Sequence, residues 1–193
     1  YFERGSAPRG DTVTYDRTAT PIRDVTPADL PDARIREADL FFTSGITPAL
    51  SDRLATTTRE LLATASEVGV STALDLNYRS KLWTPAAARE TLTSLFSDVD
   101  VLFVAERDAR NVLDCQGDSE TIARGLADEH NFETVVLTQG AEGALAVQDD
   151  VYEQSAIRTE TVDPVGSGDA FVGAYLAQRL DGASIPDALA YGA

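Results

Sequence analysis

The sequence predicts an α/β fold in which helices cover both faces of a largely parallel sheet. Segments typical of buried strands alternate with amphipathic helical segments from residue 38 onward. Small or polar residues follow several of the strand segments, where ligands bind in open sheets of this kind. A chain of 193 residues with 43% hydrophobic residues is also large enough for one domain with a sizeable core.

Each element has its own pattern. Residues 38–45 predict a buried strand that ends in glycine, and 48–69 predict a helix with apolar residues at helical spacing. Residues 71–77 predict a second strand, and 84–96 a helix that opens with threonine and proline. The rest of the alternation is a strand over 99–105, helices over 106–113 and 118–130, a strand over 132–140, a hairpin that turns at 149–150, and helices from 168 and from 184.

The amino-terminal segment differs from the rest. Residues 1–34 are rich in Pro, Arg and Thr and poorly periodic, which predicts the end of a strand and a long connection that enters the α/β body. Residues 35–193 then form the α/β core. Because the chain begins without methionine and its last helix stops at the chain end, we expect this core to be incomplete at both ends.

The charge of the chain is strongly negative. Asp and Glu number 32 against 16 Lys and Arg, so the net charge is −16, and Lys81 is the single lysine. Such a field excludes nucleic-acid binding through general electrostatics. An ordinary acidic protein and one adapted to concentrated salt both fit the net charge, but the near absence of lysine favours the halophilic explanation.

We predict that removing salt lowers the stability of the protein. The repulsion among its acidic groups extends over about 3 Å at 1 M salt but over about 10 Å at 0.1 M, so it is stronger when salt is removed. Thermal unfolding in rising KCl should therefore shift to higher temperature. A midpoint that does not respond to salt would contradict the halophilic explanation.

The composition also limits the chemistry. No apolar run is long enough to span a membrane, and a lone Cys115 excludes an internal disulfide, so we expect a cytoplasmic protein without a membrane partner. One cysteine and one histidine, His130, argue against a zinc site or a histidine-dependent triad. Cys115 is expected to be a small core residue on a helix. The sequence does not decide between a monomer and a homo-oligomer.

A glycine-rich loop precedes the helix from 168. Gly166, Ser167 and Gly168 allow the backbone to approach a ligand closely, and the helix start favours an anion. Asp169 follows directly, where it can accept a proton from a hydroxyl that attacks a phosphate. An ordinary loop with an acidic helix start explains the segment equally well when it is taken alone.

Two further segments lie at strand ends. In "DLNYRSKLW", Asp75, Asn77 and Arg79 are two residues apart, so a continued strand would point them the same way. Arg79 could then hold a carboxylate or a phosphate with its planar fork, or simply be solvated. In "LTQGAEGALAV", Gly140 and Gly143 indicate either a simple turn or a loop that contacts a nucleotide.

Four segments in order resemble the ribokinase-like (PfkB-type) carbohydrate kinases. "DPVGSGDAFVGAYLA" resembles the family's most specific motif, with Ser167 in place of the usual alanine, and "VVLTQGAEGA" is similar to its nucleotide-side segment. "ALDLNYRSKLW" and "YFERGSA" are similar to segments of the 2-keto-3-deoxygluconate kinases. The resemblance implies a three-layer α/β/α fold and use of ATP with Mg²⁺, and the family's lid strands are expected to lie largely outside this chain.

The resemblance also implies residue roles. Asp169 becomes the catalytic base, which also contacts the substrate, and residues 166–168 form the anion hole. Arg4 and Arg79 would contact the sugar acid, and Phe2 stands where an aromatic neighbour of the substrate is expected. The residues implied to lie along ATP are Asn77, Thr138, Gly140, Ala141 and Gly143.

Two positions depart from the family pattern. Where the family often has Asn-x-x-Glu, linked to organisation of magnesium and phosphate, this chain has Ala105 and Asp108. The sequence therefore assigns no metal ligand, and Asp108 is the candidate for an indirect role at the metal.

The sequence thus predicts ATP-dependent phosphorylation of a sugar-acid hydroxyl, with 2-keto-3-deoxygluconate as the expected small-molecule substrate and 2-keto-3-deoxy-6-phosphogluconate as product. A fructokinase or another neutral-sugar kinase is the nearest alternative, and a nucleoside kinase is a more distant one. A nucleotide- or sugar-binding regulator that lost catalysis, and a Rossmann-type oxidoreductase, are alternatives from other classes.

Overall fold

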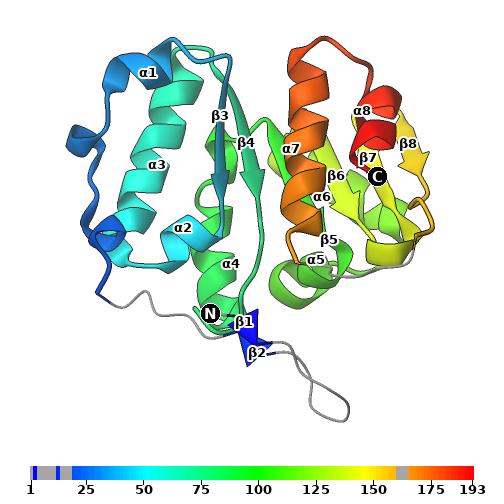
Figure 1. The fold of residues 1–193 in the computed structure, drawn as a ribbon, viewed down its shortest axis with the longest axis horizontal. Helices are drawn as coiled ribbons and strands as arrows, with labels where there is room; N and C mark the ends of the chain where they lie inside the picture. Colours follow the sequence, from blue (N-terminus) through cyan, green and yellow to red (C-terminus); the bar gives the residue numbers. More distant parts are fainter. Residues whose placement is uncertain (1, 4–11, 14–18, 160–164) are drawn as a thin grey trace.

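The computed structural model describes residues 2–3, 12–13, 19–159 and 165–193 (Figure 1). Its central sheet has six strands in the order β3-β4-β5-β6-β7-β8. The first four are parallel, and β7 and β8 are antiparallel to their neighbours. The strands are β3 (Leu40–Ser44), β4 (Ser71–Asp75), β5 (Val101–Ala105), β6 (Thr134–Thr138), β7 (Ala144–Val147) and β8 (Val151–Gln154).

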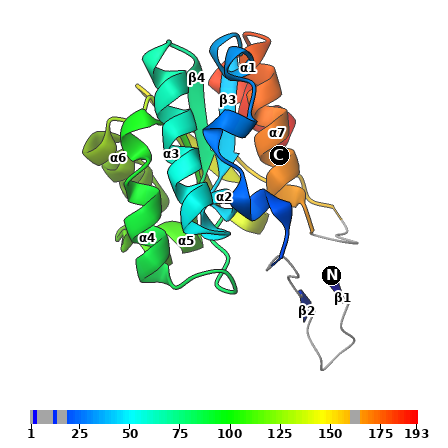
Figure 2. The ribbon, with the colours of Figure 1, turned by 90° about the vertical axis from the view of Figure 1, so that its left-hand side faces the viewer.

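Helices cover both faces of this sheet. Figure 2 shows α3, α4 and α6 on one side and α7 on the other, and α8 packs against α7 and β8. The helices are α1 (Asp32–Arg36), α2 (Ile46–Ala49), α3 (Asp52–Glu67), α4 (Pro85–Thr93), α5 (Glu106–Leu113), α6 (Ser119–His130), α7 (Ser167–Leu180) and α8 (Ile185–Gly192). Short 3-10 turns are η1 (Pro21–Asp24), η2 (Pro27–Asp29), η3 (Phe96–Asp98) and η4 (Gly140–Glu142).

The alternation of side chains along each strand creates the two cores. In β5, Leu102 and Val104 are buried against α3 to α6, whereas Phe103 between them is buried against α7 and α8. The ring of Phe103 meets Tyr175 of α7 edge to face, with 5.4 Å between ring centroids. The predicted three-layer fold with a mostly parallel sheet is therefore confirmed.

The predicted helix over 48–69 is wrong as a single element. The chain breaks after α2 at Leu50, and Ser51 adopts an extended conformation with φ −165°. Its hydroxyl accepts a hydrogen bond from the Leu54 backbone N at 3.1 Å, which caps α3, and donates to the carbonyl oxygen of Arg23 at 2.6 Å. A capping serine inside an apolar pattern thus divides one predicted helix into two.

The strand predicted over 71–77 is also too long. It ends at Asp75, and Asn77 has φ +40°, in the left-handed region that strands do not use. Leu76 still donates its backbone N–H to the Phe103 carbonyl oxygen at 2.9 Å, so the chain turns only after contacting β5.

The amino-terminal segment is described in part. β1 (Phe2–Glu3) pairs antiparallel with β2 (Thr12–Val13). Helix α1 spans the predicted boundary between residues 1–34 and 35–193, and the division into these two parts stays a prediction. Further on, the Thr57 hydroxyl in α3 donates to the Val25 carbonyl oxygen at 2.9 Å, which holds the segment beside η2 against the core.

Cys115 and His130 have structural surroundings. Cys115 follows α5 in a loop rather than lying on a helix, which corrects that detail, and burial raises the pKa of its thiol. His130 ends α6, with its ring 4.9 Å from that of Phe96. None of the helices in the described part of the chain combines the length and apolarity that crossing a membrane requires.

Candidate active site

A large cavity lies where the carboxyl ends of the central parallel strands meet. Its volume is about 1010 Å³, and it is lined by the ends of β4, β5 and β6 and by the first turns of α5 and α7. The register of the sheet explains this convergence, because Asp75 of β4 pairs with Phe103 of β5, and Ala105 of β5 pairs with Thr138 of β6. Parallel strands end at the same edge, so the residues that follow them come together.

Asp169 lies in the first turn of α7. The helix is preceded by Gly166, whose φ of +82° is in the left-handed region that favours glycine. The start of a helix carries positive partial charge, which suits a bound anion beside this exposed carboxylate. Asn77 donates from Nδ2 to Asp169 Oδ1 at 3.4 Å, a long hydrogen bond that joins the end of β4 to the start of α7.

The turn after β4 is held by close backbone packing. Gly45, which follows β3, donates its N–H to the Asp75 carbonyl oxygen at 2.8 Å. A Cβ at Gly45 would overlap the carbonyl oxygen of Leu76, so only glycine fits there. This packing fixes the backbone from which Asp75, Asn77 and Arg79 reach the cavity.

Asp75 is the carboxylate whose protonation the site changes most clearly. Burial raises the pKa of Asp75 to about 6, and the negative charge of Asp169 acts in the same direction. The backbone N–H of Asn77 and the charge of Arg79 oppose this rise, and Asp108 adds to it. The ionised form of Asp75 is therefore disfavoured in the folded protein near pH 5.

We predict that Asp75 makes stability depend on pH. Below its ordinary pKa of 3.8 the group is protonated in both states and contributes nothing. Between 3.8 and about 6 the unfolded chain releases the proton that the folded chain keeps, so folding is progressively penalised as pH rises, and the penalty is constant above that range. Two pKa units correspond to about 3 kcal/mol.

Urea unfolding of the wild type and Asp75→Asn at pH 4 and pH 7 measures this penalty. From pH 4 to pH 7, the free energy of unfolding of Asp75→Asn should rise relative to that of the wild type by roughly 2 to 3 kcal/mol. In an Asp169→Asn background the gain should be smaller, because the second cause of the shift is gone. A stability difference that is the same at both values would show that Asp75 titrates normally.

The turn after β6 is tight and closed by its own backbone. Gln139 donates its N–H to the Gly143 carbonyl oxygen at 2.8 Å, and Gly143 donates to the Gly140 carbonyl oxygen at 3.2 Å. Gly143 has φ +116° and lies against the backbone of β8, where a Cβ would overlap the Gln154 carbonyl oxygen. The turn that the sequence predicts as nucleotide-contacting is thus packed against β8 on one side of Gly143, while Gly140 and Gly143 also line the cavity.

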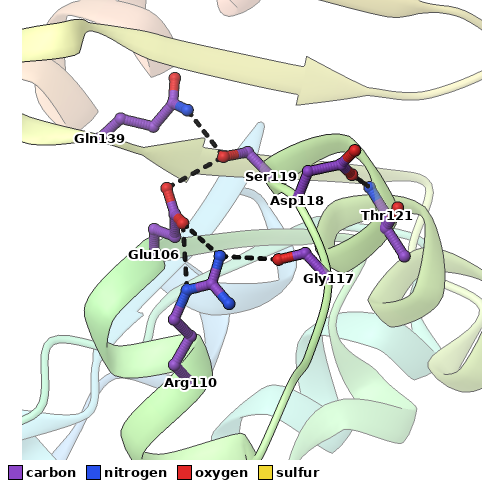
Figure 3. A network of polar contacts seen from close by, with 7 residues as sticks. All are labelled: Glu106, Arg110, Gly117, Asp118, Ser119, Thr121 and Gln139. Carbon is purple, nitrogen blue, oxygen red and sulfur yellow. Dashed lines mark hydrogen bonds and ion pairs between the residues drawn. The ribbon is translucent and has the colours of Figure 1, made fainter.

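The first turn of α5 brings charged groups to the cavity wall. Glu106 accepts two hydrogen bonds from Arg110 on Oε1, from Nε at 3.1 Å and from a terminal nitrogen at 2.6 Å (Figure 3). The bond from Arg110, followed by that from Ser119, lowers the pKa of Glu106, so this carboxylate stays ionised. Arg110 also donates to the Gly117 carbonyl oxygen at 2.8 Å.

Asp108 is buried in the same turn. Its carboxylate lies 3.3 Å from Arg107 Nε and accepts a hydrogen bond from the Tyr78 backbone, while burial raises the pKa of the group. Over the described ranges, no three His, Cys, Asp or Glu side chains are grouped as a metal site. Because Mg²⁺ keeps several waters and binds substrate phosphates, a single nearby carboxylate can still support it.

The structure brings most of the predicted site residues to one cavity, and their roles stay predictions. Ala141 lies in η4 but is not among the lining residues. Arg4 lies outside the described residues, and the side chain of Phe2 is not described. The predicted residues that line the cavity are Asn77, Arg79, Asp108, Thr138, Gly140, Gly143, Gly166, Ser167, Gly168 and Asp169.

The cavity is also lined by residues that were not predicted from the sequence, among them Glu106 and Arg110. Both belong to the "AERDAR" segment, in which Asp108 was the residue with a predicted role. The pair Glu106 and Arg110, four residues apart on a helix, is the pattern that could have indicated an ion pair.

Comparison with known proteins agrees with this geometry. Residues 9–193 match the model of the pfkB family carbohydrate kinases. The chain is 53% identical over its whole length to a 2-dehydro-3-deoxygalactonokinase of Haloferax volcanii, of which it covers 61%, and the predicted halophilic character fits this relative. It is also 30% identical over 91% of its length to a 2-dehydro-3-deoxygluconokinase of Thermoproteus tenax, of which it covers 53%.

Solved structures show the same fold. The crystal structure of a 2-dehydro-3-deoxygluconokinase of Thermotoga maritima superposes with a TM-score of 0.89 and 29% identity, over 99% of this chain and 64% of that one. The chain thus spans somewhat less than two thirds of the length of these relatives.

Proposed function

Because the chain belongs to the pfkB family of carbohydrate kinases, we propose that it transfers a phosphoryl group from ATP to a hydroxyl group of a 2-keto-3-deoxy sugar acid. The observation that carries the proposal is the convergence of Asp169, the start of α7 and the Gln139–Gly143 turn on one cavity. A base, an anion site and a nucleotide-sized space are the parts that phosphoryl transfer needs.

Each part has a task in the reaction. Asp169 accepts the proton of the attacking sugar hydroxyl, which requires a carboxylate beside the phosphate. The backbone of residues 166–168 and the positive end of α7 then stabilise the charge on the transferring group. Asn77, hydrogen-bonded to Asp169, orients that carboxylate toward the nucleophile.

A bound Mg²⁺ would neutralise charge on the phosphates of ATP. Asp108 is the residue of this chain placed to support it, through water rather than directly, because its carboxylate is buried and already engaged by Arg107 and Tyr78. A carboxylate that acts through water at an open cavity fits a hydrated ion better than a caged one.

Arg79 gives the proposal its preference for a sugar acid. It lines the cavity two residues from Asn77, and its guanidinium fork matches a carboxylate. Arg4 is proposed to act with it. Two arginines without an anion would disfavour a neutral sugar such as fructose.

We predict that Arg79→Lys raises KM for the sugar acid about tenfold or more, while KM for ATP changes much less. Lysine keeps the charge but loses the bidentate geometry, and a hydrogen bond to a charged group contributes roughly 1.5 to 3 kcal/mol. Steady-state kinetics with each substrate varied in turn measures both constants. Arg59 provides a control: its terminal nitrogen donates to Ser94 at 2.9 Å on an exposed surface, so Arg59→Lys should change neither KM.

The substrate is tested with a panel of 2-keto-3-deoxygluconate, 2-keto-3-deoxygalactonate and fructose. The sequence motifs favour 2-keto-3-deoxygluconate, whereas the 53% identical relative is named a 2-dehydro-3-deoxygalactonokinase, after the other epimer. Both sugar acids should be phosphorylated with a kcat/KM well above that for fructose. Equal values for fructose would favour the neutral-sugar alternative, and no turnover with any sugar would favour a regulator.

A further inference from the structure

One hydroxyl group connects the turn after β6 to the first turn of α5. Gln139 donates from Nε2 to Ser119 Oγ at 2.8 Å, and Ser119 Oγ donates to Glu106 Oε2 at 2.9 Å (Figure 3). Gln139 and Glu106 line the cavity, whereas Ser119 lies behind them at the start of α6 and is not a lining residue. Three segments that are distant in the sequence are thus joined behind the cavity wall.

The chemistry of the three groups gives this connection a direction. The nitrogen of an amide side chain only donates and a carboxylate only accepts, while a hydroxyl does both, so Ser119 can satisfy both neighbours at once. The other carboxylate oxygen of Glu106 accepts from Arg110. Glu106 is therefore held at both oxygens and forms a fixed anchor for Ser119.

Gln139 passes this anchoring to the turn. Its backbone N–H closes the turn on Gly143, while its side chain is fixed by Ser119. The far end of the turn is fixed separately by the close packing of Gly143 against β8. The hydrogen bond of the Gln139 side chain to Ser119 therefore fixes the first residue of the turn, and packing against β8 fixes its last residue.

We infer that Ser119 is a positioning residue that holds the Gln139–Gly143 turn in the arrangement that binds ATP. The inference rests on the proposed function, which places ATP along this turn. A turn that is ordered before the nucleotide arrives spares the cost of ordering it on binding. Ser119 does not itself line the cavity, so its effect reaches the nucleotide through the lining residues that it contacts, and Gln139 is the one that belongs to the turn.

The decisive variant is Ser119→Ala in the intact protein. It removes the oxygen that accepts from the Gln139 amide at 2.8 Å and one donor from Glu106. Kd for ATP, measured by calorimetry, and KM for ATP should rise roughly three- to tenfold, the range that one hydrogen bond contributes. The kcat value and KM for the sugar acid should stay within about twofold, and Ser119→Thr, which keeps the hydroxyl, should restore ATP affinity.

Asp118 supplies a matched control one residue away. Its Oδ1 caps α6 by accepting from the Thr121 backbone N at 2.8 Å, and it does not line the cavity (Figure 3). Asp118→Ala should lower the melting temperature and leave Kd for ATP unchanged.

Three results would overturn the inference. They are an unchanged Kd for ATP in Ser119→Ala, an equal rise in Asp118→Ala, and failure of Ser119→Thr to restore affinity. If the wild type itself bound no ATP, the proposed function would fall first, and the two failures are thereby told apart.

Discussion

Replacing Asp169 by asparagine is expected to lower kcat by about 10²- to 10⁴-fold, the range that general-base catalysis contributes. The amide is nearly the same size and shape as the carboxylate, and its oxygen can still accept the hydrogen bond from Asn77. It cannot take the proton of the attacking hydroxyl. Because the start of α7 and the Gln139–Gly143 turn are unchanged, Kd for ATP should stay close to that of the wild type.

Asp187 offers a control for the electrostatic part of this substitution. It occupies the first turn of α8, as Asp169 occupies the first turn of α7, and its carboxylate accepts from Ser184 Oγ at 2.6 Å. Asp187→Asn removes the same charge from the same place on a helix and should leave kcat unchanged. If Asp169→Asn kept more than about a tenth of wild-type kcat, Asp169 would not be the base, since the loss would lie far below the general-base range.

The parts of the site that could be predicted from the sequence are those set by short-range patterns. Strands with apolar runs predict which residues reach the same edge of the sheet, so Asn77, Thr138 and Asp169 could be expected there before any contact was known. The glycine loop before an amphipathic helix likewise predicts Asp169 in a first turn, as the structure has it.

The parts that could not be predicted depend on backbone turns and on contacts between distant segments. The sequence placed Asn77 on a continued strand, but its positive φ turns the chain, and it reaches the cavity for a different reason. The contact from Gln139 through Ser119 to Glu106 spans 20 and 13 residues, and no local pattern in the chain indicates it. Ser51 divides the predicted helix because its hydroxyl is hydrogen-bonded to the backbone of Leu54 and Arg23. The spacing of apolar residues does not indicate these hydrogen bonds.

Gly143→Ala is expected to destabilise the protein by about 3 kcal/mol or more. Its φ of +116° and ψ of −138° lie in a region that residues with a Cβ avoid, at a cost of about 1 to 3 kcal/mol. The new methyl group would also overlap the Gln154 carbonyl oxygen and lie 2.7 Å from the Ala156 backbone N, and such overpacking adds about 1 to 3 kcal/mol. The backbone of β8 cannot yield as a flexible side chain would, so the turn itself must move.

Gly140→Ala separates these two causes within the same turn. Gly140 also has a left-handed backbone, with φ +62°, but a Cβ there would meet nothing within 4 Å. It should therefore cost only about 1 to 2 kcal/mol. Thermal unfolding should show a drop of roughly 6 to 12 °C for Gly143→Ala and clearly less for Gly140→Ala, given about 2 to 4 °C per kcal/mol for a chain of this size. Equal drops in the two variants would mean that backbone conformation alone, and not contact with β8, requires glycine at 143.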